Sequence, residues 1–283
     1  MLSDEELSSR FATDLDAVMK VLCLHDDGQN ENIFKYKLDC LLQKLHHSNE
    51  DISFHFVNGP LQCSNSLAED LLLPELLCYK FYETEEVKDI RKAGEWLAIK
   101  LDKDGPYDGV VAFSQGAAVV SSFLLYRQWY DHELPPAFKF AIFISGSISL
   151  KVLKDLGVPV SNEAESAVSQ AMLRHDQGLG PLSAHVTRAR RAVFDSDDCF
   201  GLNLNRLPLE LKIRIPTVHI WGEKDPLFPT SIQLAGLCDP YIRKIHTHPE
   251  GNEIPQGENE LAQIVPLIEW CIQRGTWPGQ MQL

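Results

Sequence analysis

Ser114 is the residue whose surroundings most clearly predict chemistry. An apolar run from Val110 to Phe113 leads directly into Ser114, and Gln115 and Gly116 then begin a helical pattern. A sharp turn from strand to helix exposes the serine hydroxyl at a helix N-terminus, where backbone N–H groups favour developing negative charge. The pattern therefore predicts a nucleophile that attacks carbonyl groups. The alternative is a serine that caps an ordinary strand–helix junction.

Small residues flank Ser114, as such a tight turn requires. Its usual form has glycine two residues to either side of the nucleophile. Here Gly116 fills the second position and Ala112, the smallest replacement, fills the first. The turn would bring the N–H groups of Gln115 and Gly116 towards a substrate oxygen, so both are candidate oxyanion or substrate-binding residues.

The elements that must position Ser114 alternate along the chain. Apolar runs predict strands, and amphipathic patterns between them predict helices. Strands are expected at residues 20–25, 52–60, 107–114, 138–146, 215–225 and 243–248, and helices at residues 31–46, 85–106, 115–129, 230–238 and 259–273. Residues 61–84 are expected to be irregular. The alternation is typical of the α/β class, with a mainly parallel sheet and helices on both faces.

The chain is expected to form one large domain, because 283 residues suit a single α/β domain. Residues 1–19 are expected to form an N-terminal helical extension. Residues 20–283 form the domain, with an insertion at about 150–210. Residues 160–175 predict either a lid-like helix or an extra helix packed on the core, with an apolar stripe of Val160, Ala164, Ala167, Val168 and Met172.

Five segments, in order along the chain, match the motifs of one enzyme family. They read VLCLHDDGQNENIFKYKLDCLLQKL, GPYDGVVAFSQGAAVV, FKFAIFISG, IPTVHIWGEKDPLFP and HTHPEGNEIP. Together they resemble the FSH family of serine hydrolases, within the α/β-hydrolase superfamily, over roughly residues 20–270. The resemblance implies the α/β-hydrolase fold.

The same resemblance implies a catalytic triad in the order serine, acid, histidine. The serine matches Ser114, and the acid matches Asp225, which ends an apolar strand and precedes Pro226. Open α/β sheets place catalytic groups at the carboxyl ends of their strands, so the local pattern agrees. The alternative role for Asp225 is in a turn or a helix cap.

Asn252 occupies the position of the triad histidine. The family's loop has Gly-Gly-His, then a hydrophobic residue and proline, whereas residues 250–255 read Glu-Gly-Asn-Glu-Ile-Pro. An amide has no useful basicity near neutral pH, so Asn252 cannot take the proton of Ser114. The triad is therefore degenerate, and losing its base costs orders of magnitude in acyl transfer.

The loop expected to form the oxyanion hole also departs from the family. After His25 the family usually has glycine, but Asp26 and Asp27 follow here. A carboxylate within about 4 Å of an oxyanion repels it by roughly 4 kcal/mol at an effective dielectric constant of about 20. A carboxylate in an apolar pocket also has a raised pKa and can act as a general acid or base. These three residues are therefore candidate catalytic residues, in one pocket with Ser114 and Asn252.

Other histidines are possible replacements for the missing base. His246 and His248 would share one face of the expected strand by period-2 spacing. The resemblance implies a structural role for His248, since relatives often have a histidine there besides the catalytic one. It stays a candidate substrate-binding residue. His25 is alternatively an anchor of its loop, and His219 is expected to lie in the core.

Three functions remain open. The favoured one is non-hydrolytic: cyclisation, isomerisation or dehydration by acid–base catalysis and carbonyl polarisation. The resemblance implies a polyketide-like substrate of fungal-type secondary metabolism. The first alternative is an esterase or thioesterase that releases a polyketide acyl chain through Ser114 with a displaced histidine. The second alternative is a binding protein without catalysis.

The composition limits partners and compartment. A net charge of −14 and a pI of about 5.1 argue against nucleic-acid and anionic-membrane partners, which need basic surface. No apolar run reaches the roughly 18 residues that span a bilayer, and the acidic N-terminus is unlike a signal peptide. Seven scattered cysteines without a CxxC pattern indicate reduced thiols in a cytoplasmic protein without a metal site. We expect a small-molecule substrate and no cofactor, and the oligomeric state stays open.

Overall fold

A six-stranded parallel sheet forms the centre of the molecule. A computed structural model describes residues 18–48, 51–63, 77–189 and 199–277. The strand order is β2-β1-β5-β6-β7-β8, and every neighbouring pair in it is parallel. The strands are β1 (Met19–Leu24), β2 (Ile52–Val57), β5 (Gly109–Phe113), β6 (Phe140–Ile144), β7 (Thr217–Gly222) and β8 (Arg243–His248). The predicted α/β class with a mainly parallel sheet is confirmed.

The central strands are buried on both faces, which explains their continuous apolar runs. Every residue of β5, β6 and β7 is buried. In a parallel sheet covered by helices, alternation of polar and apolar residues would place polar groups against a helix. Because all six strands run the same way, their carboxyl ends meet at one edge, where Ser114 follows β5.

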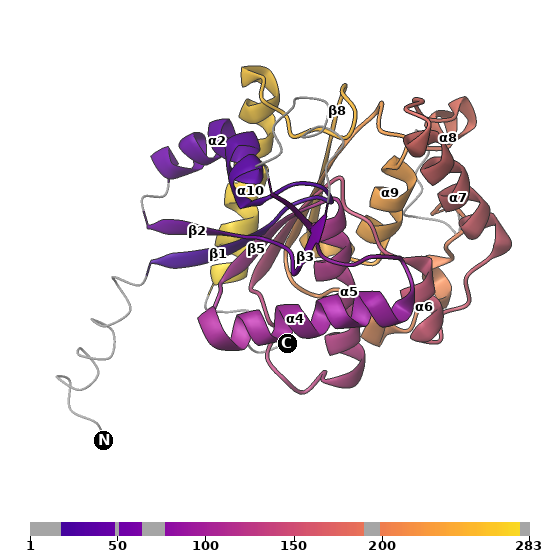
Figure 1. Ribbon diagram of the computed structural model, residues 1–283, viewed down its shortest axis with the longest axis horizontal. Helices are drawn as coiled ribbons and strands as arrows, with labels where there is room; N and C mark the ends of the chain where they lie inside the picture. The colour runs from indigo at the N-terminus through magenta and orange to yellow at the C-terminus, as the bar shows by residue number, and fades with distance from the viewer. Residues whose placement is uncertain (1–17, 49–50, 64–76, 190–198, 278–283) are drawn as a thin grey trace.

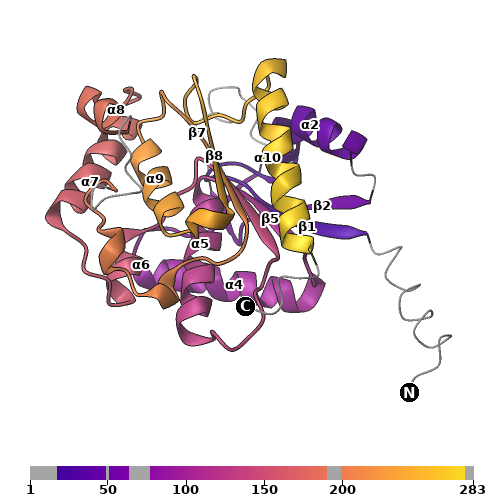
Figure 2. The same ribbon diagram turned by 180° about the vertical axis from the view of Figure 1, so that it is seen from behind.

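Helices cover the two faces of the sheet (Figures 1 and 2). One face carries α2 (Glu31–Ser48) and α10 (Glu258–Thr276), and their apolar stripes pack with the strands in one core cluster. The other face carries α4 (Val87–Asp104), α5 (Gln115–Tyr130) and α9 (Phe228–Gly236). Helix α4 ends before Gly105-Pro106, because proline lacks the N–H that would continue it.

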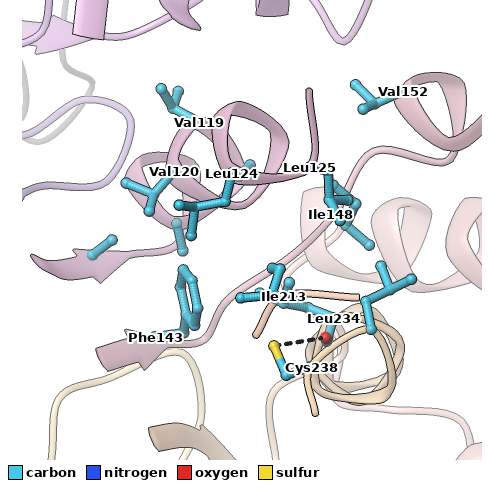
Figure 3. Close-up of a cluster of buried hydrophobic side chains, with 14 of the residues drawn as sticks. Val119, Val120, Leu124, Leu125, Phe143, Ile148, Val152, Ile213, Leu234 and Cys238 are labelled. Carbon is cyan, nitrogen blue, oxygen red and sulfur yellow. Dashed lines mark hydrogen bonds between the residues drawn. The ribbon is translucent and has the colours of Figure 1, made fainter. Parts of the chain in front are cut away.

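The larger core cluster lies between α5 and the sheet. Figure 3 shows Val120 and Leu124 of α5 on the side of the helix that faces Phe143 of β6, and Val119 on the opposite side. Burying a side chain of this kind contributes about 1.5–3 kcal/mol. This packing holds α5 against the sheet and so fixes where its N-terminus, next to Ser114, points.

Between β6 and β7 the chain forms further helices. They are α6 (Leu150–Asp155), α7 (Asn162–Asp176), α8 (Ser183–Ala189) and the 3-10 turns η1 (Leu204–Arg206) and η2 (Leu209–Leu211). Helix α7 lies beside α9 (Figures 1 and 2) and packs on the core through Ala164, Ala167 and Ala171. The expected apolar stripe was wrong at Met172, which is 37% exposed, because the inward face of the helix continues through Ala171.

A short antiparallel ribbon joins β3 (Leu61–Cys63) to β4 (Cys78–Lys80). The expectation that residues 61–84 are irregular was therefore wrong at these six residues. Strands of three residues carry too little periodicity to be recognised, and their pairing is not local in sequence. The remaining short element is η3 (Pro240–Ile242).

The ends of the chain bear on two further expectations. The expected N-terminal extension over residues 1–19 lies outside the described residues except for Val18 and Met19, the latter beginning β1. In the part of the chain that the structure describes, no helix is both long enough and apolar enough to cross a bilayer.

Candidate active site

Ser114 occupies a strained turn between β5 and α5. Its backbone has φ 48° and ψ −108°, a conformation that a residue with a Cβ adopts only under constraint. Its N–H donates to the carbonyl of Ile144 at the end of β6, at 3.0 Å. A Cβ on Gly116 would lie 2.7 Å from the carbonyl oxygens of Leu24 and His25, so only glycine fits there. The turn therefore has the geometry of a nucleophile elbow.

Asp26 points its carboxylate at this turn. Its Oδ1 accepts from the N–H of Gln115 at 3.2 Å and from the N–H of Asp27 at 2.7 Å. Burial raises the pKa of Asp26, and a hydrogen bond from the Ser114 hydroxyl is the largest opposing influence. The N–H of the residue after the nucleophile is the usual oxyanion donor. Asp26 thus occupies the place where a substrate oxyanion would bind.

The oxyanion roles expected for Gln115 and Gly116 are changed by this arrangement. The N–H of Gly116 donates to the carbonyl of His25 at 3.1 Å, so it does not face a substrate. The side chain of Gln115 accepts from the N–H of Phe81 at 2.7 Å and donates to the carbonyl of Tyr82 at 3.3 Å. Gln115 therefore ties the start of α5 to the segment after β4.

His25 forms hydrogen bonds through both of its ring nitrogens. Its Nε2 accepts from the N–H of Gly59 at 3.0 Å, which leaves Nδ1 protonated to donate to the carbonyl of Asp26 at 2.6 Å. Burial lowers the pKa of this imidazole. Both nitrogens are engaged in these bonds, which fits the alternative role of a loop anchor, and the catalytic role of His25 stays a prediction.

Asp27 lies at the surface of the same loop. Its Oδ2 accepts from the side chain of Gln115 at 3.4 Å, and its Oδ1 is 4.0 Å from the Sγ of Cys63. Partial burial raises the pKa of Asp27, and the charge of Lys80 opposes that shift. Asp27 therefore borders the site without contacting Ser114 among the hydrogen bonds of the described residues.

Asp225 is fully buried just after β7. Its Oδ1 accepts from the N–H of Leu227 at 2.8 Å, while its Oδ2 has no partner among the described residues that meets hydrogen-bond geometry. Burial raises the pKa of Asp225; the Leu227 N–H, the charge of His175 and the Ser145 hydroxyl oppose this, and the charge of Asp26 raises it further. The half-buried carboxylate of Asp26 and the buried carboxylate of Asp225 therefore interact at the carboxyl edge of the sheet.

Asn252 lies in the loop after β8, which is pressed against the end of β7. The N–H of Lys224 donates to the carbonyl of Glu250 at 2.9 Å. A Cβ on Gly222 would lie 2.1 Å from the same oxygen, so the loop needs glycine there. The Oδ1 of Asn252 is buried without a hydrogen-bond partner in the described part of the chain. The amide therefore makes no described bond to Ser114 or Asp225.

His246 and His248 lie on β8 near α10. The Nε2 of His246 is 2.8 Å from Oε2 of Glu260. His248 is buried, and neither of its ring nitrogens has a partner among the described residues. Burial lowers the pKa of His248, and the charges of His246 and Glu260 also influence it. In the described residues neither histidine bonds to Ser114, and the substrate-binding role of His248 stays a prediction.

His219 has the core position that its sequence predicts. It is 1% exposed, its ring stacks on Phe143 with centroids 5.3 Å apart, and its Nε2 lies 3.1 Å from Oγ1 of Thr217. Burial lowers its pKa to about 3. This imidazole stays neutral at physiological pH and takes no part in the site.

Sequence reasoning missed several residues of the site. Ser145 follows the apolar run of β6 with φ 43°, as Ser114 follows that of β5, and this parallel was the available signal. His175, in the last turn of α7, influences Asp225, although nothing local indicates that it should. Burial is the main cause that raises the pKa of Tyr82 and that of Glu85. The charges of Glu85, Asp26 and Asp27 raise the pKa of Tyr82 further, and the charge of Lys151 opposes the rise at Glu85.

Comparison with known families gives the site its context. The family model described as "Serine hydrolase (FSH1)" matches residues 15–264. The chain belongs to the FSH1 serine hydrolase family. Its fold is accordingly the α/β-hydrolase fold, as the parallel sheet and the elbow after β5 require. Membership indicates a hydrolase-type enzyme.

Named relatives cover most of the chain. Esterase alnB of Emericella nidulans is 26% identical over 284 residues, covering 90% of this chain and 96% of the relative. Esterase FPY3 of Fusarium mangiferae is 28% identical, covering 84% and 89%. Hydrolase FUB4 of Fusarium oxysporum is 25% identical, covering 88% and 97%. Among solved structures, a carboxylesterase from Mesorhizobium loti aligns with a TM-score of 0.48 at 14% identity, covering 90% of this chain and 92% of that one.

Proposed function

We propose that this chain hydrolyses an ester or thioester bond of a small molecule, with Ser114 as nucleophile and Asp26 as its base. The observation that carries the proposal is the position of the Asp26 carboxylate at the turn of Ser114, where its Oδ1 accepts from the N–H of Gln115 at 3.2 Å. The Ser114 hydroxyl lies near enough to oppose the rise in the pKa of Asp26. The relatives named above are called esterases and hydrolases. Their names favour hydrolysis over the non-hydrolytic reaction that the sequence led us to expect first.

The first step is a proton transfer coupled to attack. The Ser114 oxygen bonds to the substrate carbonyl carbon while its proton moves to Asp26. Burial raises the pKa of this carboxyl, which makes Asp26 a stronger base than an exposed aspartate. Negative charge therefore leaves the carboxylate and appears on the substrate oxygen.

The transfer of the proton to Asp26 frees the N–H of Gln115 to donate to the oxyanion as that oxyanion forms. The N–H of Gln115 donates to Asp26 at rest. A hydrogen bond to an ionised acceptor is roughly twice as strong as one to a neutral acceptor, so the N–H turns from the protonated carboxyl to the new oxyanion. One donor of this kind contributes about 3–4 kcal/mol to the transition state.

The second half of the reaction reverses the roles of Asp26. Its proton passes to the departing alcohol or thiol, which leaves an acyl group on Ser114. The carboxylate, ionised again, then takes a proton from the water that attacks this acyl group. Asp225 makes no described hydrogen bond to Ser114, so the proposed mechanism includes no proton transfer to or from Asp225.

The substrate class we propose is a polyketide-like acyl ester or thioester. The fungal origin of the esterases and the hydrolase named above supports this class.

A second function is favoured by one observation. Among the described hydrogen bonds of Ser114 none is to an imidazole, and a raised pKa lets a neutral Asp26 donate to a substrate carbonyl. In that case cyclisation, isomerisation or dehydration would proceed without an acyl-enzyme. The two functions differ in their need for the Ser114 hydroxyl.

The deciding experiment compares three variants with the wild type. Labelling by a fluorophosphonate probe and turnover of p-nitrophenyl butyrate are expected to disappear in Ser114→Ala. In Asp26→Asn both are expected to fall by about 10²–10⁴-fold, the usual contribution of a general base. His175→Ala is the matched control, because it removes the titratable group of α7 that influences Asp225, and it should keep a rate close to wild type.

Other outcomes would contradict the proposal at separate points. Turnover of a β-keto acyl substrate that survives in Ser114→Ala and is lost in Asp26→Asn would replace hydrolysis by the non-hydrolytic reaction. A loss in His175→Ala as large as that in Asp26→Asn would assign the base to α7 instead of the oxyanion loop.

A further inference from the structure

Two cysteines face each other across the β3–β4 ribbon. The strand register pairs Cys63 with Cys78, next to the pair of Gln62 and Tyr79. Residues directly opposite each other in an antiparallel pair place their side chains on the same face of the ribbon. The two thiols therefore lie on one face, and in the structure both are reduced.

The backbone bonds of β4 decide the spacing of this pair. The N–H of Tyr79 donates to the carbonyl of Gln29 at 2.7 Å, and its carbonyl accepts from the N–H of Gly28 at 3.1 Å. Tyr79 thus directs its backbone N–H and carbonyl towards Gly28 and Gln29, in the loop after β1. Because successive residues of a strand direct these groups to opposite sides, the N–H and carbonyl of Cys78 point towards β3. In such a hydrogen-bonded pair the Cα atoms are about 5.5 Å apart. Disulfides bridge Cα atoms at roughly 4.4–6.8 Å and Cβ atoms at roughly 3.5–4.5 Å. Opposite Cβ atoms of a hydrogen-bonded pair lie about 5.5 Å apart, so the bond would draw the two strands closer together at this point.

The ribbon is attached to the catalytic loop at several points. Besides the two bonds of Tyr79, the next residue but one, Phe81, donates its N–H to the side chain of Gln115. Cys63 is half-exposed, and its Sγ lies 4.0 Å from Oδ1 of Asp27. The pair is therefore open to an oxidant on one side and joined to the Ser114 site on the other.

We propose that Cys63 and Cys78 form a reversible disulfide that lowers turnover at the Ser114 site. The oxidant is a peroxide. Burial and the charge of Asp27 raise the pKa of the Cys63 thiol, so the reactive thiolate forms as the pH rises. This thiolate attacks one peroxide oxygen and becomes a sulfenic acid, and hydroxide leaves. The Cys78 thiolate then attacks the Cys63 sulfur, and the S–S bond forms as a second hydroxide leaves. The two thiol protons convert the hydroxides to water, so two electrons pass from the thiols to hydrogen peroxide.

The disulfide would act on the site in two ways. It removes the Cys63 thiol from beside Asp27, and it ties β3 to the strand that holds Gly28 and Gln29. The proposed reaction requires Asp26, on that same loop, to release the N–H of Gln115. A stiffer ribbon opposes this adjustment, so turnover should fall several-fold. The effect on turnover rests on the proposed function, whereas formation of the disulfide does not.

Peptide mapping tests the disulfide itself. Trypsin leaves both cysteines in one peptide, residues 45–80, and cleavage after Glu69 and Glu75 separates them unless a disulfide joins the pieces. After treatment of the full chain with hydrogen peroxide, we expect a joined pair of peptides that dithiothreitol separates. Cys63→Ser should abolish it, and Cys40→Ser, which removes an exposed cysteine of α2, should keep it. Separate peptides in the oxidised wild type would overturn the proposal.

Turnover of p-nitrophenyl butyrate tests the consequence. Oxidised wild type and oxidised Cys40→Ser are expected to lose turnover several-fold and to regain it with dithiothreitol, while Cys63→Ser should be insensitive to peroxide. A mapped disulfide with unchanged turnover would overturn the effect on the site. If the reduced enzyme has no esterase turnover, the proposed function fails, and the mapping still decides whether the disulfide forms.

Discussion

At the scale of single residues, one carboxylate distinguishes this site from an ordinary serine hydrolase. In the proposed site Asn252 stands at the position that the family resemblance assigns to the imidazole, and the Asp26 carboxylate lies at the turn of Ser114 and accepts from the N–H of Gln115. Each change alone would impair acyl transfer. Together they are compatible with it, because the added carboxylate can take the proton and then release the oxyanion donor.

A pH profile should show this carboxylate directly. Burial raises the pKa of Asp26 above its usual value of about 3.9. Only the ionised form can accept the serine proton, so kcat/KM should rise as the pH rises through that elevated pKa and level off above it. The measurement is the kcat/KM of p-nitrophenyl butyrate against pH.

Two variants identify the group whose ionisation causes the rise of kcat/KM at acidic pH, the acidic limb of the profile. Asp26→Asn should lower the plateau and flatten the acidic limb, because its amide does not titrate. His175→Ala should keep the limb. A limb that persists in Asp26→Asn and vanishes in His175→Ala would show that the imidazole of α7 is the base.

At the scale of elements, the elbow depends on the close approach of α5 to β1. The start of α5 touches the backbone that follows β1, and Gly116 leaves room for that contact. The apolar residues of α5 then hold the helix in place (Figure 3). Local sequence could predict the strand, the turn and the helix, since each has its own periodicity. It could not predict the β3–β4 ribbon, whose six residues pair across a segment of the chain.

Glycine substitutions test the fit at the elbow. In Gly116→Ala the new Cβ would lie 2.7 Å from two backbone oxygens, which cannot move cheaply, so we expect destabilisation on the order of 2–4 kcal/mol and loss of fluorophosphonate labelling. Gly94→Ala in α4 is the matched control. Nothing lies within 4 Å of its added Cβ, so it should stabilise the protein by about 0.5–1 kcal/mol.

Urea unfolding of both variants measures these changes. Equal and small shifts of the two midpoints would show that the contact between α5 and the loop after β1 is loose. That result would also remove the steric reason for glycine at position 116.

At the scale of the whole molecule, negative charge predominates around the site, although Lys80 lies near Asp27. The chain has a net charge of −14, and Asp26, Asp27 and Asp225 gather at the carboxyl edge of the sheet. A negative field of this kind concentrates cations and repels anions near the site. The substrate should therefore be neutral or cationic close to its reacting carbonyl.

Matched esters measure this selectivity. We expect p-nitrophenyl esters with a trimethylammonium group on the acyl chain to have a higher kcat/KM than those ending in a carboxylate. The ratio should fall as sodium chloride is added, because the screening length shortens from about 30 Å at 0.01 M to about 8 Å at 0.15 M. A ratio below one at low salt would contradict this account of the field.

The sequence alone determined the order of the strands and helices along the chain, the elbow at Ser114 and the family; the loss of the imidazole at Asn252 stays a prediction. These follow from local periodicity, small residues at a tight turn and residue types at matched positions. Only the tertiary structure decided where Asp26 points, that both nitrogens of His25 are engaged, and that Cys63 faces Cys78. Those facts depend on contacts between segments far apart in the chain, and loop conformations that carry no periodic pattern set their distances.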